Sequence, residues 1–233
     1  LLDYEKHSEI LSVNFNNVLG VDYNNIIKFL QELPSKCTPT SKGSGVYFIG
    51  MNQLLSIVGE TLNVSCQKAS LILSGLSINS KNLDDDCRKI YNPKQEYRLL
   101  KRAFVVYPSS TGNFIAYSKD MLLELKILLM NGLVFKHLPV EWLVGDIKKD
   151  LDLISNSAGV WFEKIVEREI NKLNIKTIQS VKKIRLKGEK AVFIPQDVGE
   201  IDIVGYSEVD KAIVVIECKL ISRSTEPKYY RND

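Results

Sequence analysis

The sequence predicts an α/β fold in two parts, a mostly helical N-terminal part and a C-terminal part in which strands follow a helix. Three observations support this prediction. Apolar residues recur with helical spacing through the first half, strand-like apolar runs carry charged residues near the C-terminus, and turn-forming residues interrupt the pattern near residues 145–157. We therefore expect one domain over residues 1–150 and a second over residues 151–233.

Four segments of the N-terminal domain have the apolar spacing of amphipathic helices. Between the third and the fourth lie two strand-like runs joined by a turn-forming stretch, a pattern that predicts a β-hairpin over residues 103–117. The four helical segments are 24–33, 51–62, 67–76 and 119–133.

Residues 52–76 weakly resemble a helix-turn-helix, with residues 63–65 as its turn. With the 103–117 hairpin as a wing, the N-terminal domain resembles a winged-helix DNA reader. Ordinary packing of two helices explains the same pattern, and the second helix offers few polar side chains for reading bases. Substrate choice, regulation and oligomerisation are therefore the roles that we expect of this domain.

The C-terminal domain is expected to begin with a helix over residues 158–173, capped by Ser157 after a break at residues 155–157. Glu163 lies at the margin of the apolar face of this helix. No basic residue stands three or four positions away to form a helical ion pair with it. Glu163 is then either a ligand aimed at the sheet or an unpaired acid on the solvated surface.

Two strand-like runs, 200–204 and 213–219, carry acids and a lysine among apolar residues, which is costly unless the charges are compensated. Because side chains alternate along a strand, Glu200 and Asp202 share one face of the first run, and Glu217 and Lys219 share one face of the second. If the chain reverses between Val209 and Asp210, Asp202 lies opposite Glu217 with Cβ atoms roughly 5 Å apart.

Carboxylates grouped in this way suit metal-assisted hydrolysis of a phosphodiester, because hard oxygen ligands select Mg²⁺ or Mn²⁺. Lys219 would orient or deprotonate the attacking water, or stabilise the charged transition state. The alternative is an edge strand that turns these charges toward solvent.

Glu163, Asp202 and the triplet Glu217-Cys218-Lys219 together resemble the PD-(D/E)xK nuclease superfamily over about the last third of the chain, residues 155–233. The resemblance implies a restriction-endonuclease-like mixed sheet flanked by helices. It implies that Glu163, Asp202 and Glu217 are metal ligands, that Lys219 is the catalytic lysine, and that Glu200 is an added ligand or supports the others.

This sequence departs from the family at two points. Ile201 stands before Asp202 where the family has proline, a change that should leave the ligand geometry intact. The sequence also stops where the family's second helix and fourth strand should follow, so we expect the nuclease-like domain to be truncated.

The resemblance implies an Mg²⁺-dependent endonuclease acting on DNA, with Mn²⁺ as a substitute, in restriction, repair or antiviral defence. RNA stays open as a substrate, and a homodimer would suit coordinated cuts of two strands. The first alternative is a non-catalytic nucleic-acid-binding or assembly module with the same fold. The second is a regulatory DNA-binding protein led by the N-terminal helices, which would need no metal.

Composition is consistent with a cytoplasmic enzyme. No apolar run approaches the roughly 20 residues that cross a bilayer, so no membrane partner is expected, and the four cysteines lack metal-ligand spacing. The net charge of +3 is too small to indicate nucleic-acid binding, but basic residues cluster around the acidic strands, where they contact phosphates or line a solvated strand face. The candidates for phosphate contact are Lys182, Lys183, Arg185, Lys187, Arg223 and Lys228.

Overall fold

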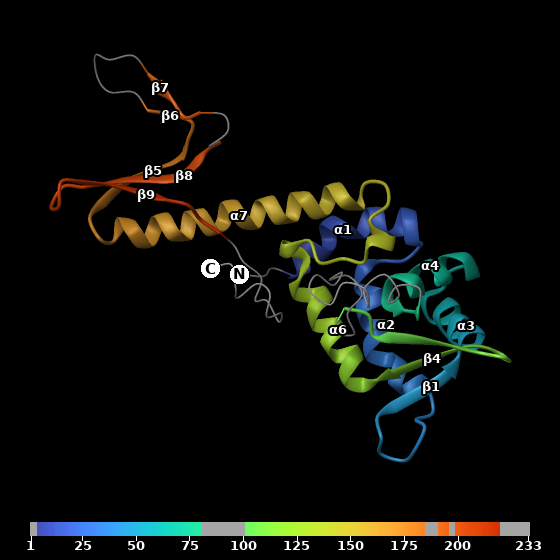
Figure 1. Ribbon diagram of the computed structural model, residues 1–233. Coiled ribbons are helices and arrows are strands. Elements are labelled where there is room, and N and C mark those ends of the chain that lie inside the picture. Colours follow the sequence, from blue (N-terminus) through green and yellow to red (C-terminus); the bar gives the residue numbers. More distant parts are fainter. Residues whose placement is uncertain (1–3, 81–100, 185–190, 196–198, 220–233) are drawn as a thin grey trace. The chain divides into compact units, whose positions relative to one another are not determined.

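The computed structural model describes residues 4–80, 101–184, 191–195 and 199–219 (Figure 1). These residues form a mixed α/β structure in which helices dominate the first half and strands the last part, as the sequence predicts. In the described part of the chain, no helix combines the length and the apolar character needed to cross a membrane.

The chain divides into two compact units, residues 1–154 and 155–233, and the division falls inside helix α7 (Ile147–Asn171). The predicted helix break at residues 155–157 is therefore wrong. Ile154 and Ala158, one turn apart, are both buried, so the apolar face of α7 continues through this stretch. Serine and asparagine in a helix cost only a few tenths of a kcal/mol more than strong helix formers, too little to end it.

Three helices contribute about a third of the buried apolar side chains of the first unit: α1 (Tyr4–Leu19), α2 (Tyr23–Lys36) and α6 (Lys119–Asn131). The first of these was not predicted, because its buried positions form only a narrow stripe among polar residues. In the core, the ring of Phe15 packs edge-on against that of Tyr23, with centroids 4.9 Å apart, and the Tyr23 hydroxyl donates a hydrogen bond to a backbone carbonyl of α6. Fully burying such side chains stabilises the unit by about 1.5–3 kcal/mol each.

The first unit also holds a mixed four-stranded sheet in the order β1-β4-β3-β2. Strand β1 runs directly into helices α3 and α4, and the β3–β4 hairpin pairs with β1 through β4, as Figure 1 shows for β1 and β4. The turn-forming stretch of the predicted hairpin, residues 108–112, makes a turn shorter than its own length, since Pro108 pairs with Asn113 and Ser109 with Gly112. The bounds are β1 (Val46–Gly50), α3 (Met51–Leu62), α4 (Cys66–Leu76), β2 (Ser77–Ile78), β3 (Phe104–Ser109) and β4 (Gly112–Ser118).

A buried arginine joins α4 to the short helix η3 (Val140–Trp142), which follows η2 (Leu133–Phe135). Arg102 is 1% exposed and donates hydrogen bonds to the backbone carbonyls of Ser74 and Gly75, at 3.0 and 2.9 Å. The same guanidinium nitrogen lies 2.8 Å from a carboxylate oxygen of Glu141. This cation compensates the last carbonyls of α4 as well as an acid that is largely withdrawn from water.

The second unit contains an antiparallel sheet in the order β5-β8-β9, formed by β5 (Ile175–Val181), β8 (Ile201–Ser207) and β9 (Ala212–Ile216). A two-stranded ribbon joins β6 (Lys183–Ile184) to β7 (Val192–Phe193). The Thr177 hydroxyl bonds to side chains of Glu167 and Asn171, which places the end of α7 against one sheet face.

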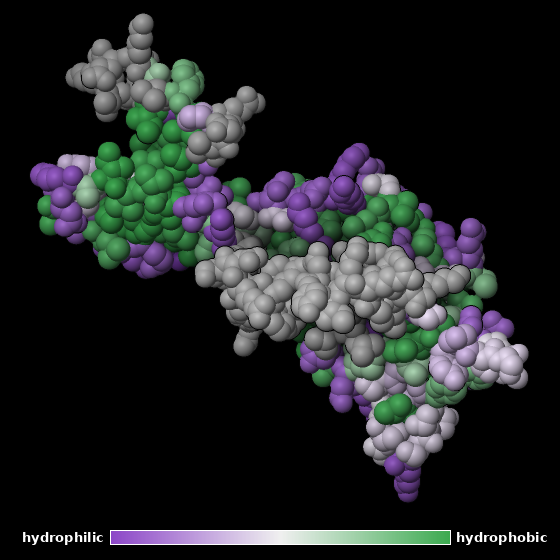
Figure 2. Space-filling model, viewed as in Figure 1, coloured by the Kyte–Doolittle hydropathy of each residue, from purple (hydrophilic) through white to green (hydrophobic). Residues whose placement is uncertain are grey.

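The other face of this sheet carries several exposed apolar side chains. Ile178 follows Thr177 and so points to the side opposite α7, and it is paired with Val204 in the register of β5 and β8. Hydrophobic residues gather over these strands in Figure 2. Exposed side chains on this face are Ile178, Tyr206, Ile213 and Val215.

The reversal between β8 and β9 lies where the sequence predicts it. Ile203 pairs with Ile216 and Ser207 with Ala212, so the turn is centred between Val209 and Asp210. The Ser207 hydroxyl donates to the Asp210 carboxylate at 2.6 Å and accepts from the Asp210 N–H at 3.2 Å. These bonds hold the register that aligns the acidic ends of the two strands.

Gly75→Ala is expected to destabilise the protein by about 1–3 kcal/mol, because the added methyl group would overlap the fully buried indole of Trp142. The control is Gly159→Ala in α7, where the methyl group would meet nothing within 4 Å. Alanine at that helical position should stabilise by up to about 1 kcal/mol. Chemical denaturation followed by tryptophan fluorescence measures both, and unchanged stability of Gly75→Ala would contradict the packing described.

Candidate active site

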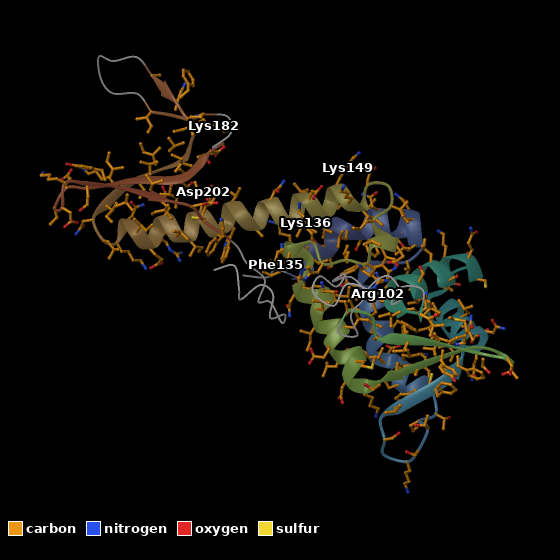
Figure 3. All side chains as sticks on the ribbon, in the orientation of Figure 1. Arg102, Phe135, Lys136, Lys149, Lys182 and Asp202 are labelled. Carbon is orange, nitrogen blue, oxygen red and sulfur yellow. The ribbon has the colours of Figure 1, made fainter. Side chains whose placement is uncertain are left out.

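Asp202, labelled in Figure 3, lies near the start of β8, beside the end of β9. Its carboxylate Oδ2 accepts a hydrogen bond of 2.5 Å from the backbone N–H of Cys218. The pairing of β8 with β9 ends at Ile216, so the Asp202 side chain supplies the acceptor that a longer strand ladder would have supplied. This bond fixes one oxygen of Asp202 beside the Glu217-Cys218-Lys219 triplet.

Glu163 on α7 lies within electrostatic reach of the acids at the start of β8. Partial burial raises the pKa of Glu163, and the negative charges of Asp202 and Glu200 raise it further. Burial likewise raises the pKa of the Cys218 thiol, with Asp202 and Glu163 adding to the effect. Glu163 and Asp202 therefore lie close enough for their charges to interact, although 39 positions separate them in the sequence.

Glu200 has a different environment, because groups at the end of β5 compensate its charge. A hydrogen bond with the Ser180 side chain and a second with Lys182 hold the pKa of Glu200 below its usual value. Lys182 Nζ lies 3.0 Å from Glu200 Oε2. Continuing the pairing of Val181 with Ile201 by one residue places Lys182 opposite Glu200, so this ion pair spans neighbouring strands.

Ser180 interrupts the regular geometry of β5. It has a left-handed backbone with φ of 54°, a conformation that costs a non-glycine residue about 1–2 kcal/mol. The pairing of β5 with β8 includes Gln179 with Ile203 and Val181 with Ile201, and Ser180 lies between them, opposite Asp202. The irregularity thus sits beside the acids, and the sequence carries no glycine or turn signal that could have predicted it.

Glu217 and Lys219 lie beyond the last residue of β9, so the prediction that they belong to a strand is wrong. Continuing the strand register by one residue does place Asp202 opposite Glu217, as expected. However, the Glu217 carboxylate forms an ion pair of 3.2 Å with Lys219, and the two side chains are 74% and 66% exposed. The acids that share an electrostatic environment are Glu163, Glu200 and Asp202.

These residues supply the carboxylate oxygens that Mg²⁺ and Mn²⁺ prefer. These residue types suit a metal, but their positions do not form a complete site. In the described ranges, no three His, Cys, Asp or Glu side chains are arranged to hold a metal ion. The hydrogen bond to Cys218 and the ion pairs of Glu200 and Glu217 occupy carboxylate oxygens that a metal would need. A metal would therefore have to compete with these interactions.

Two of the candidate phosphate contacts lie in the described chain. Lys182, labelled in Figure 3, is 75% exposed and pairs with Glu200, and Lys183 is exposed on β6. Both lie on the segment that follows β5, and Lys182 lies beside one of the acids. The remaining candidates, Arg185, Lys187, Arg223 and Lys228, lie outside the described residues.

Comparison of the chain with protein-family models, with curated proteins and with solved structures gave no match.

Glu163→Gln is expected to stabilise the protein near neutral pH. Because folding raises the pKa of Glu163, the folded state binds its proton more tightly than the unfolded state, and stability falls as pH rises from the ordinary value of 4.5 through the raised pKa of the folded state. Glutamine removes this loss, so the melting temperature should rise at about pH 7 and change little at about pH 4.

The matched control is Glu167→Gln, one turn further along α7, where the carboxylate accepts a hydrogen bond of 3.2 Å from Thr177. This substitution keeps an acceptor for Thr177 and should give no gain near neutral pH. Thermal denaturation at the two pH values measures the difference. An equal effect of both substitutions would contradict the like-charge environment of Glu163.

Proposed function

We propose that the chain is a metal-dependent nuclease that hydrolyses DNA phosphodiester bonds. One observation carries the proposal: Glu163 from α7 and Asp202 from β8 lie within electrostatic reach of each other, beside the Glu217-Cys218-Lys219 segment. A helix glutamate, a strand aspartate and a following Glu-x-Lys triplet are the pattern by which the sequence resembles the PD-(D/E)xK superfamily. A restriction-endonuclease-like fold for the second unit belongs to the same proposal.

The residues have separate roles in this proposal. Glu163, Asp202 and Glu217 bind Mg²⁺, for which Mn²⁺ substitutes, and the Cys218 N–H keeps Asp202 oriented. The bound metal supplies neutralisation of the charge that develops on the phosphate and acidification of a water molecule. Lys219 orients or deprotonates that water or stabilises the transition state, and Glu200, held by Lys182, supports the ligands.

Recognition of DNA is assigned to both units. Lys182 and Lys183 contact phosphates beside the acids, while the first unit acts as a winged helix. The order of β1, α3, α4 and the β3–β4 hairpin supports this role, since it supplies two consecutive helices and a wing that shares a sheet with the strand before them. DNA is preferred over RNA because most of the resembled superfamily acts on DNA.

The second candidate function is a nucleic-acid-binding or assembly module without catalysis. The exposed ion pair between Glu217 and Lys219 favours it. Each of these two residues balances the charge of the other, away from Glu163, Glu200 and Asp202. The two functions differ in their need for metal, because a binding module would bind nucleic acid equally well in the presence and absence of chelator.

Asp202→Ala and Lys219→Ala are each expected to lower Mg²⁺-dependent DNA cleavage by about 10²-fold or more, since each removes a group required for the chemical step. The assay uses plasmid and single-stranded DNA with Mg²⁺, with Mn²⁺ or with chelator. Lys176→Ala is the control. Lys176 lies on β5 of the same sheet, but its ion pair of 2.6 Å is with the exposed Glu208 and not with the acids of the candidate site. DNA binding without cleavage, unaffected by chelator or by either substitution, would overturn the catalytic proposal and favour the binding module.

Lys183→Gln is expected to weaken DNA binding to a similar extent for all sequences, because a phosphate contact carries no base information. The slope of log affinity against log salt concentration should decrease by about 1. Titration of labelled duplex DNA at several salt concentrations measures this slope. Lys176→Gln is the control, because it removes the same single positive charge at another position. An unchanged slope would remove Lys183 from the interface.

A further inference from the structure

The first unit contains a pocket of about 430 Å³ between α3, α4, the β3–β4 hairpin and η3. This volume falls in the range of about 300–1,000 Å³ that is typical of small-molecule sites. The pocket is lined by both apolar and polar side chains. Apolar side chains come from three elements, namely Met51, Leu55, Leu73, Val106 and Pro108, and polar ones include Ser70, Ser74, Ser77, Asn113 and Glu141.

Ser77 is the first indication of a ligand. The residue is only 8% exposed and lines the pocket, yet its hydroxyl oxygen has no hydrogen-bond partner among the described residues. A buried hydroxyl without a partner is unfavourable, and buried polar groups are nearly always paired. A ligand that both donates to and accepts from Ser77 would remove this penalty.

Glu141 is the second indication. Its Oε2 lies 2.8 Å from Arg102, but the contact lacks the alignment of a hydrogen bond, so this oxygen can still accept one. Arg102, labelled in Figure 3, balances the charge of the carboxylate from the interior. None of the described lining residues is basic. The pocket is therefore close to neutral, rich in acceptors, and unsuited to a phosphate or another anion.

The volume of the pocket, its near-neutral charge and its lining residues together indicate what kind of ligand it fits. Apolar side chains from α3, α4 and β3 would cover the faces of a flat ring, while Ser77 and Glu141 would meet its edge. The edge must carry N–H donors for the carboxylate and a group that bonds the hydroxyl. Guanine, with two adjacent N–H groups and a carbonyl, has this pattern, whereas saturated sugars lack a flat apolar face.

We propose that this pocket binds a nucleobase, with the base edge held by Ser77 and Glu141. The same chemistry has two sources, a free nucleoside and a base turned out of a DNA strand. The site lies in the first unit, and the proposed nuclease residues lie in the second. The inference therefore goes beyond the proposed function and does not depend on it.

The test is isothermal titration of the full chain with guanosine and, separately, with a DNA duplex that contains one unpaired guanine. Ser77→Ala should weaken binding by about tenfold, the effect of losing one good hydrogen bond to the ligand. Ser56→Ala on the exposed face of α3 is the matched control, because its hydroxyl bonds only to the backbone of its own helix at 3.2 Å. Ser74→Leu, at an exposed position on the pocket rim, should block binding.

Each outcome decides the proposal. Guanosine binding that Ser77→Ala weakens supports a free-nucleoside site, and binding of the unpaired-guanine duplex alone, weakened in the same way, supports capture of an extruded base. Failure of both probes to bind wild type, or binding that is equal in Ser77→Ala and Ser56→Ala, overturns the proposal. Thermal denaturation controls for folding, because Ser77→Ala removes an unpaired hydroxyl and should melt no lower than wild type. Chelator should leave the binding of guanosine unchanged, which separates this result from the metal-dependent cleavage assay.

Discussion

Repulsion among carboxylates is the physical constraint on which the candidate site depends. Asp202 and Glu200 lie close enough to Glu163 to disfavour its negative charge, and the fold compensates the three acids unequally. Glu200 has Lys182 and Ser180, and Asp202 has the N–H of Cys218, while the described surroundings of Glu163 only disfavour its charge. Repulsion within such a group of acids destabilises the fold, and a bound cation would relieve that repulsion.

Strand pairing places these acids, and the middle position of β8 is what makes the grouping possible. One edge of β8 carries β5, which brings Ser180 and Lys182 to Glu200, and the other carries β9, whose end brings Cys218 to Asp202. Helix α7 covers one face and adds Glu163. In the first unit a buried charge is also compensated by neighbouring elements, since Arg102 donates hydrogen bonds to the end of α4 and balances the charge of Glu141.

Local patterns were enough to predict the parts of the fold that local forces decide. Residues 51–62 were predicted as a helix with the observed ends, from apolar residues at helical spacing and a turn at residues 63–65, and Asn63 ends the helix in a left-handed conformation. The hairpin reversal at Val209 and Asp210 was also predicted, since polar turn residues separate two apolar runs. Sequence signals failed where distant partners decide the outcome. The break in α7 was predicted from capping residues, but a continuous buried face overrode them, and the partners of Arg102 and Glu200 come from other elements. The pattern of Glu217 and Lys219 predicted that both side chains lie on one side, but not that the strand ends before them and that they pair with each other.

The tight turn between β8 and β9 has a consequence for how chains of this kind can change length. Residues 208–211 lie between the last paired residues, Ser207 and Ala212, so a residue added there can be taken up by the loop without a change of register. A residue added within β8 or β9 is different, because side chains alternate along a strand and a slip of one position would send Asp202 or Glu217 to the opposite side of the sheet. If the alignment of the two acids is kept, length should therefore vary at the tip of this hairpin and not within its strands.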